Sequence, residues 1–361
     1  MILTAILLIV SLAIILVAAE LFTNAVEWLG HKLNLNEGVV GSILAAVGTA
    51  MPETMIPVVA ILYTGGEHGH EVGVGAILGA PFMLATLAMF ITGLAVVGFA
   101  RGGRRTTELR VNSKVLGRDI RFFLIGYLLA IVAAFVPIYA FKVVIAIVVV
   151  GLYVYYVYKH ATDSEEAPMT YEDMEGMSPL EAAEELAGQP EHLAPLHFQR
   201  WKSTPRFWVV CAQLVVSLAI MLVGAYMFVE QVTAVALAIG IPALILSLLI
   251  APVATELPEK MNSVLWVRQG KDTLALGNLT GAMVFQSCIP AAFGMVFGEW
   301  AITAESTSAF VSAGIAILAA AVIFGSLNFG GRKLTANALL TGGVFYVAYV
   351  VYLLVAGGAH A

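Results

Sequence analysis

The feature that most constrains this chain is a series of apolar segments, each long enough to cross a lipid bilayer. A transmembrane helix needs about 20 mostly apolar residues, and these segments are too long and too little alternating for membrane strands. Of all residues, 60% are hydrophobic and 12% charged, against about 25% charged in a typical soluble domain. Ten segments meet the length criterion, at approximately 2–29, 37–63, 72–99, 119–136, 139–159, 206–229, 234–266, 273–298, 307–328 and 334–356. The expected fold is an all-α membrane protein with ten transmembrane helices.

The same composition excludes several classes of protein. Soluble globular enzymes and disordered proteins carry more charge, and a net charge of −6 offers no basic surface to a nucleic acid. The two cysteines, Cys211 and Cys288, lie in apolar segments and are expected to form no disulfide framework. Because no basic residue precedes the first apolar segment, we interpret it as a retained span and not as a cleaved signal peptide.

The basic residues test the number of spans, because cytoplasmic loops carry an excess of lysine and arginine. When the ten segments are threaded through a membrane, 16 of the 18 basic residues fall on the side opposite the N-terminus. These are Lys32, Arg101, Arg104, Arg105, Arg110, Lys114, Arg118, Arg121, Lys159, Arg200, Lys202, Arg206, Arg268, Lys271, Arg332 and Lys333. Lys142 lies on the other side and Lys260 inside a span. The distribution predicts a multi-pass protein of the plasma (cell inner) membrane with both termini extracytoplasmic.

The two halves of the chain match when one is shifted by 206 residues. Residues 11–53 and 217–259 share 14 identities in 43 positions without a gap. The shared residues include a threonine and a Pro-Glu pair, namely Thr49, Pro52 and Glu53 in the first half and Thr255, Pro258 and Glu259 in the second. Since each half holds five spans, an odd number, the second copy is predicted to be inverted. The predicted organisation is a five-span repeat over 1–159, a linker over 160–205 and a second five-span repeat over 206–361.

The linker over 160–205 is strongly acidic. Its ten acids are Asp163, Glu165, Glu166, Glu172, Asp173, Glu175, Glu181, Glu184, Glu185 and Glu191. The sequence at 178–181, Ser-Pro-Leu-Glu, has the spacing of a capping box, which predicts a short helix over about 179–187. We interpret the linker as a solvated cytoplasmic connection. A cation-sensing loop is the alternative, although no EF-hand pattern accompanies it.

Acidic residues inside the spans are the best indicators of function. A carboxylate near the bilayer centre costs at least about 2.5–3.5 kcal/mol, so it usually marks an ion pathway or a proton relay. Glu53 and Glu259 each follow a proline, and a proline frees the carbonyl group four residues earlier. Together with the nearby threonines, these oxygens would form a cage for a hard cation such as Ca²⁺, which takes six to eight oxygens. The alternative is a pair of proline-kinked helices whose acids pair with Lys260.

These motifs resemble those of the cation/Ca²⁺ exchanger superfamily, which includes the Na⁺/Ca²⁺ exchangers. Its two inverted α-repeats each carry G-T-S-x-P-E and then G-N-x-x-G-S-N. The corresponding segments here are 48–53 and 75–81 in the first half and 254–259 and 277–283 in the second. The resemblance implies an exchanger-like fold in which Glu53 and Glu259 bridge the central cation, a metal ion. It also implies oxygen ligands from the hydroxyls of Thr49 and Thr255 and the carbonyls of Ala46 and Pro252.

The chain departs from the family's pattern at several ligand positions. The motif serines and the amide or acid one turn later are replaced by Ala50, Ala80 and Leu84 in the first half and by Glu256, Ala282 and Gln286 in the second. Glu256 and Gln286 remain candidate cation ligands. Lys260 directly follows Glu259, and its charge would modulate the site by occupying a position that a cation otherwise fills. Because a desolvated carboxyl group suits a proton carrier, coupling to Na⁺ and coupling to H⁺ are both open.

Further polar residues are candidates for supporting roles. Glu20, Asn24 and Glu230 lie in the first and sixth spans, with Asn24 and Glu230 at equivalent positions. They would line an access path, or else be interfacial or pack against a neighbouring helix. The outer segment 67–71, Glu-His-Gly-His-Glu, is interpreted as a polar loop, with a transition-metal site at its histidines as the alternative.

The function that we expect is secondary active antiport, in which Ca²⁺ is exchanged for Na⁺ (or H⁺) across the membrane by alternating access. The partners would be inorganic cations and the lipid bilayer, with no cofactor and no nucleic acid, and a monomer would suffice for transport. The alternatives are an H⁺-coupled or non-Ca²⁺ cation antiporter and a degenerate exchanger fold that senses cations. An enzyme is not expected, because no motif such as H-E-x-x-H lies within the spans.

Overall fold

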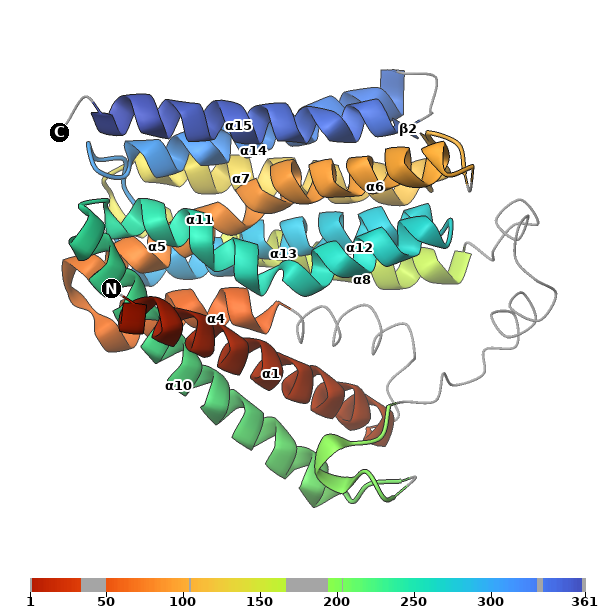
Figure 1. Cartoon of the computed structure of the whole chain (residues 1–361), viewed down its shortest axis with the longest axis horizontal. Helices are drawn as coiled ribbons and strands as arrows, with labels where there is room; N and C mark the ends of the chain where they lie inside the picture. The colour runs from red at the N-terminus through yellow and green to blue at the C-terminus, as the bar shows by residue number, and fades with distance from the viewer. Residues whose placement is uncertain are drawn as a thin grey trace. The chain divides into compact units, whose positions relative to one another are not determined.

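A computed structural model shows that the chain is almost entirely helical (Figure 1). It describes residues 2–33, 50–103, 105–166, 194–202, 204–329 and 334–358. The helices form two compact units. Unit 1 comprises Met1–Leu16, Ala50–Tyr153 and Met221–Ala361, and unit 2 comprises Val17–Thr49 and Val154–Ile220. Each unit is described by itself below.

The apolar runs form helices because a backbone in hydrocarbon must satisfy its own N–H and C=O groups. The first half contains α1 (Ile2–Lys32), α4 (Met51–Val59), η2 (Ala60–Thr64), α5 (Gly66–Met83), η3 (Leu84–Ala88), α6 (Met89–Arg101), α7 (Ser113–Phe135) and α8 (Tyr139–Glu166). The second half contains α10 (Phe207–Ile239), α11 (Ala243–Thr255), α12 (Leu257–Arg268), α13 (Asp272–Phe297), α14 (Thr307–Phe329) and α15 (Ala336–Gly358), preceded by the short turn η4 (His197–Gln199). Each predicted span corresponds to one helix or to consecutive helices, although residues 37–49 of the second span lie outside the described ranges.

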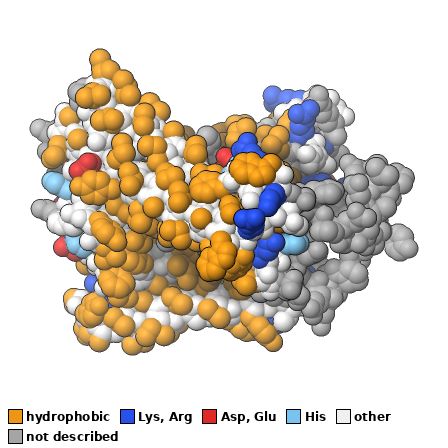
Figure 2. Space-filling view, turned by 90° about the horizontal axis from the view of Figure 1, so that it is seen from below, with side chains coloured by type: hydrophobic (Ala, Val, Ile, Leu, Met, Phe, Trp, Pro, Cys, Tyr) orange, Lys and Arg blue, Asp and Glu red, His pale blue; other side chains and the backbone are white. Residues whose placement is uncertain are grey.

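The surface of these helices is suited to contact lipid. Within the described ranges, seven helices are long and apolar enough to cross a membrane, and two shorter apolar helices, Met51–Thr64 and Ala243–Val253, accompany them. Large hydrophobic side chains such as Ile9, Ile147 and Leu354 are more than half exposed, and hydrophobic atoms cover much of the face in Figure 2. Soluble monomers rarely expose apolar patches of this extent. The prediction of an all-α membrane protein is confirmed.

Two predicted boundaries are wrong. The sixth span does not end at 229, because α10 continues to Ile239 and the chain turns at Gly240 (φ 72°) before α11. The residues around this turn are apolar, so hydropathy does not mark it. The segment 67–71 is not a loop, because α5 already begins at Gly66, after a turn made by Gly65 (φ 59°) and Gly66 (φ 65°). Only glycine adopts such positive φ angles readily. The predicted turn near Pro137 is confirmed, since it lies between α7 and α8.

In unit 1, α5 packs closely against α11, and two glycines permit this approach. A Cβ atom at Gly75 would collide with the carbonyl group of Leu244, and one at Gly79 with that of Leu248. Small residues at such positions let membrane helices approach backbone to backbone. The glycines of the segment 75–81, which the sequence analysis aligned with a cation-site motif, therefore also serve helix packing. Elsewhere in unit 1, α7 packs against α13 and α6 against α15.

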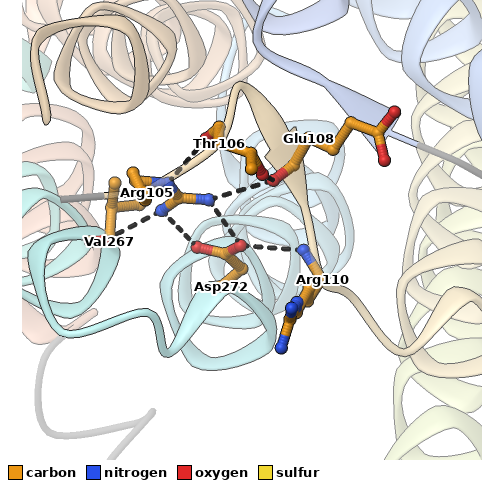
Figure 3. A network of polar contacts seen from close by, with 6 residues as sticks. All are labelled: Arg105, Thr106, Glu108, Arg110, Val267 and Asp272. Carbon is orange, nitrogen blue, oxygen red and sulfur yellow. Dashed lines mark hydrogen bonds and ion pairs between the residues drawn. The ribbon is translucent and has the colours of Figure 1, made fainter. Parts of the chain in front are cut away.

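A buried polar network joins the segment after α6 to the N-terminus of α13 (Figure 3). Arg105 donates to both carboxylate oxygens of Asp272, at 2.7 Å each, and to the carbonyl oxygen of Val267 at 2.9 Å. The backbone N–H of Arg110 donates to the same carboxylate at 2.8 Å. Asp272 is only 2% exposed, and bidentate arginine–carboxylate pairs are among the strongest polar contacts. Beside the network, the two-residue strands β1 (Glu108–Leu109) and β2 (Leu334–Thr335) pair antiparallel.

Unit 2 contains the remaining parts of α1, α8 and α10 together with the end of the predicted linker. Its small apolar core consists of Trp28, Leu196 and Val210. The indole N–H of Trp28 donates to the carbonyl oxygen of Ala194 at 2.9 Å. The end of the linker is therefore held against α1 and α10.

The start of the predicted linker is helical, because α8 continues past 159 to Glu166. Residues 167–193, which include the predicted helix over 179–187, lie outside the described residues.

Candidate functional site

Two short helices, α4 and α12, begin 206 residues apart, one in each half. Ala50 precedes α4 with φ −85° and ψ 5°, and Glu256, between α11 and α12, has φ −88° and ψ 10°. A proline lies within the first two positions of each helix, Pro52 in α4 and Pro258 in α12. Proline is tolerated there because the N–H it lacks has no partner within the helix. The matched sequences thus give matched helix starts.

Glu53 is the buried acid in the first turn of α4. It is 6% exposed, and neither carboxylate oxygen has a hydrogen-bond partner in the part of the chain that the structure describes. The Thr255 hydroxyl and the Lys260 ammonium, both from the second half, face it. The Thr255 hydroxyl donates to the carbonyl oxygen of Ala251 at 3.0 Å. Buried polar atoms without partners are rare in native proteins, so these two oxygens are available to bind a proton or a cation.

Glu256 and Lys260 form a buried ion pair at the start of α12. Glu256 is 0% and Lys260 4% exposed, and Lys260 Nζ lies 3.4 Å from Glu256 Oε2. Lys260 Nζ also donates to the carbonyl oxygen of Pro252 at 3.1 Å. On the other side, the Gln286 side-chain amide of α13 donates to Glu256 Oε1 at 3.4 Å. The pair is therefore held by α11, α12 and α13 together.

The structure thus gathers several of the predicted site residues in one place within unit 1. These are Glu53, Thr255, Glu256, Lys260, Gln286 and the carbonyl of Pro252. Thr49 and Ala46 lie outside the described residues. Glu259 belongs to α12, but its side chain is not among those described. The roles predicted for these last three residues stay predictions.

Asn24 and Glu20 lie in unit 2. The Asn24 side chain, 5% exposed, donates to the carbonyl oxygen of Ala194 at 3.2 Å. It accepts hydrogen bonds from the backbone N–H of His197 at 3.2 Å and from the Gln213 side chain at 3.0 Å. Glu20 lies 3.7 Å from the His197 ring. Asn24 therefore packs against the end of the linker and α10, whereas Glu20 is largely exposed. The access-path role given to the two residues stays a prediction.

The remaining supporting candidates lie around the start of α5. Glu230 is exposed and, with His68 and Thr233, lines an open hollow in unit 1. His68 Nδ1 lies 3.4 Å from Glu71. Among the described residues, no group of three or more His, Cys, Asp or Glu side chains is placed to hold a metal ion.

Sequence reasoning missed a second buried polar contact in unit 1. The Thr280 hydroxyl donates to Asp119 Oδ2 at 2.8 Å, and each residue is 1% exposed. Thr280 lies within the Gly-Asn-x-x-Gly segment at 277–281, which was the available signal. Asp119 was overlooked because it lies within the basic run from Arg101 to Arg121 and was counted only as part of a span.

The chemistry of the buried cluster fits a hard cation. Besides both oxygens of Glu53, the Oε1 atom of Gln286 is buried without a hydrogen-bond partner among the described residues. Carboxylate, amide and carbonyl oxygens are the ligands that Ca²⁺ prefers.

Comparison with known proteins gives a consistent result. The family model described as sodium/calcium exchanger protein matches residues 3–159 and 209–358. The chain is 26% identical over 295 residues to the inner membrane protein YrbG of Escherichia coli (strain K12), covering 80% of this chain and 78% of YrbG. Its fold matches the H⁺/Ca²⁺ exchanger CAX with a TM-score of 0.65 at 15% identity, over 97% of this chain and 82% of CAX. It also matches the sodium–calcium exchanger NCX_Mj with a TM-score of 0.55 at 17% identity, over 97% and 98% of the two chains.

Proposed function

The chain belongs to the sodium/calcium exchanger protein family, and from this membership we propose that it exchanges Ca²⁺ for Na⁺ or H⁺ across the membrane by alternating access. The observation that carries the proposal is the Glu53 carboxylate, which is buried without a hydrogen-bond partner among the described residues and faces Thr255 and Lys260. A buried carboxylate whose oxygens lack hydrogen-bond partners is costly, and binding of a proton or a cation removes that cost. The two solved exchangers of the same fold, one H⁺/Ca²⁺ and one sodium–calcium, support Ca²⁺ as the substrate.

In this proposal the two halves contribute matched ligands to one cation. Glu53 and Glu259 bridge Ca²⁺, Thr49 and Thr255 add hydroxyl oxygens, and Ala46 and Pro252 add carbonyl oxygens. Glu256 and Gln286 complete the ligand set from the second half. The matched helix starts after Ala50 and Glu256 support this arrangement, because the Pro-Glu motifs of both halves occupy equivalent positions in α4 and α12.

Exchange follows from competition for the same oxygens. When Ca²⁺ leaves, the carboxylates of the site keep a net negative charge, so the empty site has a high energy in the bilayer. Loading with Na⁺ or H⁺ lowers that energy and permits the return step. The protein therefore crosses between inward- and outward-facing states loaded with one substrate or the other, which is obligatory exchange.

The same proposal includes the membrane arrangement. The chain comprises two inverted five-span repeats, over 1–159 and 206–361, joined by a cytoplasmic linker over 160–205. Both termini face away from the cytoplasm, and the protein resides in the inner (plasma) membrane, as the name of its relative YrbG suggests for that protein.

The test is Ca²⁺ uptake into proteoliposomes that contain the purified full-length chain. Outward Na⁺ and H⁺ gradients are imposed in separate assays, and we expect one of them to drive uptake. Glu53→Gln should abolish uptake, because the variant loses the bridging charge. Glu299→Gln is the matched control, since Glu299 is exposed outside the cluster, and it should retain the wild-type rate.

Two outcomes would contradict antiport. Equal uptake by the wild type and Glu53→Gln, independent of either gradient, would rule out exchange at this site. Ca²⁺ binding by calorimetry without flux under any gradient would favour a cation sensor. The described contact of the Lys260 ammonium with a predicted ligand carbonyl is the observation that keeps this alternative open.

A further inference from the structure

Lys260 places a positive charge among atoms that the sequence resemblance assigns to a cation. Its Nζ atom lies 3.1 Å from the carbonyl oxygen of Pro252, which is a predicted backbone ligand. It also lies 3.4 Å from Glu256 Oε2, and its charge faces the Glu53 carboxylate. An ammonium group has three donors and no acceptor, so it interacts with oxygens much as a monovalent metal ion does.

The position of Lys260 in the fold is also specific. Its equivalent in the first half, 206 residues earlier, is Thr54. The backbone N–H of Thr54 donates to the carbonyl oxygen of Ala50, and that of Lys260 donates to the carbonyl oxygen of Glu256. The Thr54 hydroxyl donates to the Ala50 carbonyl oxygen at 2.9 Å and carries no charge. The positive charge therefore enters the cluster from the second half alone. Lys260 is 4% exposed, so it cannot reach solvent in the described conformation.

We propose that Lys260 is a resident cation that takes the place of one transported monovalent ion and so limits the exchange to two monovalent ions per Ca²⁺. The inference rests on the proposed function, because it counts the Glu259 carboxylate that this function assigns to the same site. Glu53, Glu256 and Glu259 then carry three negative charges, and Lys260 reduces the net charge to −2. One Ca²⁺ neutralises this charge, as do two Na⁺ or two H⁺.

The charge of the loaded site decides how many ions it carries, because the site moves within a low-dielectric membrane, where an uncompensated charge is unfavourable. Wild-type exchange is then electroneutral, because one Ca²⁺ or two monovalent ions neutralise the charge of −2. Removal of the Lys260 charge makes the site −3. Three monovalent ions then neutralise it, whereas one Ca²⁺ leaves a charge of −1, so each Ca²⁺ should exchange for three monovalent ions, more slowly than in the wild type and with the movement of one net charge.

The experiment measures the steady-state ratio of internal to external Ca²⁺ in proteoliposomes. The full-length chain works under a fixed outward gradient of the driving ion, and the membrane potential is clamped with K⁺ and valinomycin. A steady-state ratio depends on stoichiometry and not on the amount of active protein, so partial misfolding of a variant does not disturb it. For the wild type we expect no change in the ratio between 0 and 100 mV, inside negative.

Lys260→Met should make the ratio depend on voltage. One net charge leaving per Ca²⁺ entering should lower the ratio roughly 50-fold for 100 mV, inside negative. Lys260→Arg keeps the charge, so its ratio should be insensitive to voltage. Lys142→Met is the matched control, because Lys142 lies in the first turn of α8, outside the cluster. The double variant Glu256→Gln/Lys260→Met returns the net charge to −2 and should again be insensitive to voltage.

A second variant keeps the inference open to test where Lys260→Met is inactive. Glu256→Gln alone leaves a net charge of −1, so the ratio should change with voltage in the opposite direction. Voltage-insensitive ratios for Lys260→Met, or for Glu256→Gln when Lys260→Met is inactive, would overturn the role of Lys260 while leaving antiport intact. Absence of wild-type uptake under either gradient would instead reject the proposed function, and the resident cation with it.

Discussion

At the scale of residues, buried charges in this protein have partners that fix a particular geometry. Lys260 is held by a carbonyl and a carboxylate, and Asp272 receives two hydrogen bonds from Arg105 and one from a backbone N–H. Glu53 differs, because neither of its oxygens has such a partner in the described part of the chain. The contrast distinguishes the acid whose oxygens are available to a substrate from charges that protein groups already hold in place.

The pair of Arg105 and Asp272 gives a prediction about stability. Arg105→Lys keeps the charge but loses the planar, two-pronged geometry that matches the carboxylate. We expect the free energy of unfolding to fall by about 1–3 kcal/mol, since a nearly buried carboxylate loses part of its hydrogen bonding. The measurement is thermal or denaturant unfolding of the detergent-purified protein. Arg268→Lys is the control, because Arg268 is exposed and should tolerate the change; equal stability of the two variants would contradict the prediction.

At the scale of elements, the sequence predicts the starts of α4 and α12 better than it predicts the end of α10. The prolines at 52 and 258 indicate that one helix starts after Ala50 and another after Glu256, because proline is confined to the start of a helix or to a kink. The end of α10 is not predictable from hydropathy, because apolar residues continue through the turn at Gly240. Only its positive φ of 72°, which a sequence does not display, separates α10 from α11.

The pairings of the site were only partly predictable for a similar reason. Glu256 and Lys260 are four residues apart, a spacing that brings side chains together on a helix, so their contact could be expected from the sequence. The contact between Lys260 and Pro252 could not be expected from the sequence, because it depends on how the chain turns at Glu256, between α11 and α12. The contact between Arg105 and Asp272 was also not predicted. The sequence analysis used Arg105 only as one of the basic residues on the cytoplasmic side and looked for no partner.

The interface between α5 and α11 gives a prediction at this scale. Gly79→Ala introduces a Cβ atom that collides with the backbone at Leu248, and a backbone cannot move aside as a flexible side chain can. The two helices must separate, and we expect a loss of about 1–3 kcal/mol, typical of overpacking, together with slower transport. Unfolding and proteoliposome uptake are the measurements.

Gly314→Ala in α14 is the matched control, because a Cβ atom there has no neighbour within 4 Å among the described residues. Alanine is also a better helix former than glycine, so this variant should be as stable as the wild type or more so. If Gly79→Ala matched Gly314→Ala in both measurements, close packing of α5 on α11 would not be a requirement of the fold.

At the scale of the whole molecule, the family membership and the helical fold account for the extreme composition of the chain. The scarcity of charge reflects its apolar, helical surface, and the charges that remain are concentrated in a few places. Two such places are the buried cluster around Lys260 and the network around Asp272, and they join residues from both halves of the chain. The proposed exchange would use such contacts, because both halves would contribute ligands to one site.

The orientation in the membrane is the last prediction, and it follows from the distribution of basic residues over the whole chain. Lysine and arginine are retained on the cytoplasmic side, so Arg268 should face the cytoplasm and Lys142 the outside. Single cysteines are introduced as Lys142→Cys and Arg268→Cys in a background in which Cys211 and Cys288 are replaced by alanine. In intact cells, a membrane-impermeant maleimide should label Lys142→Cys, whereas Arg268→Cys should react only after the membrane is permeabilised. The reverse pattern would place the termini in the cytoplasm, and labelling of both positions in intact cells would mean that the chain crosses the membrane a different number of times between them.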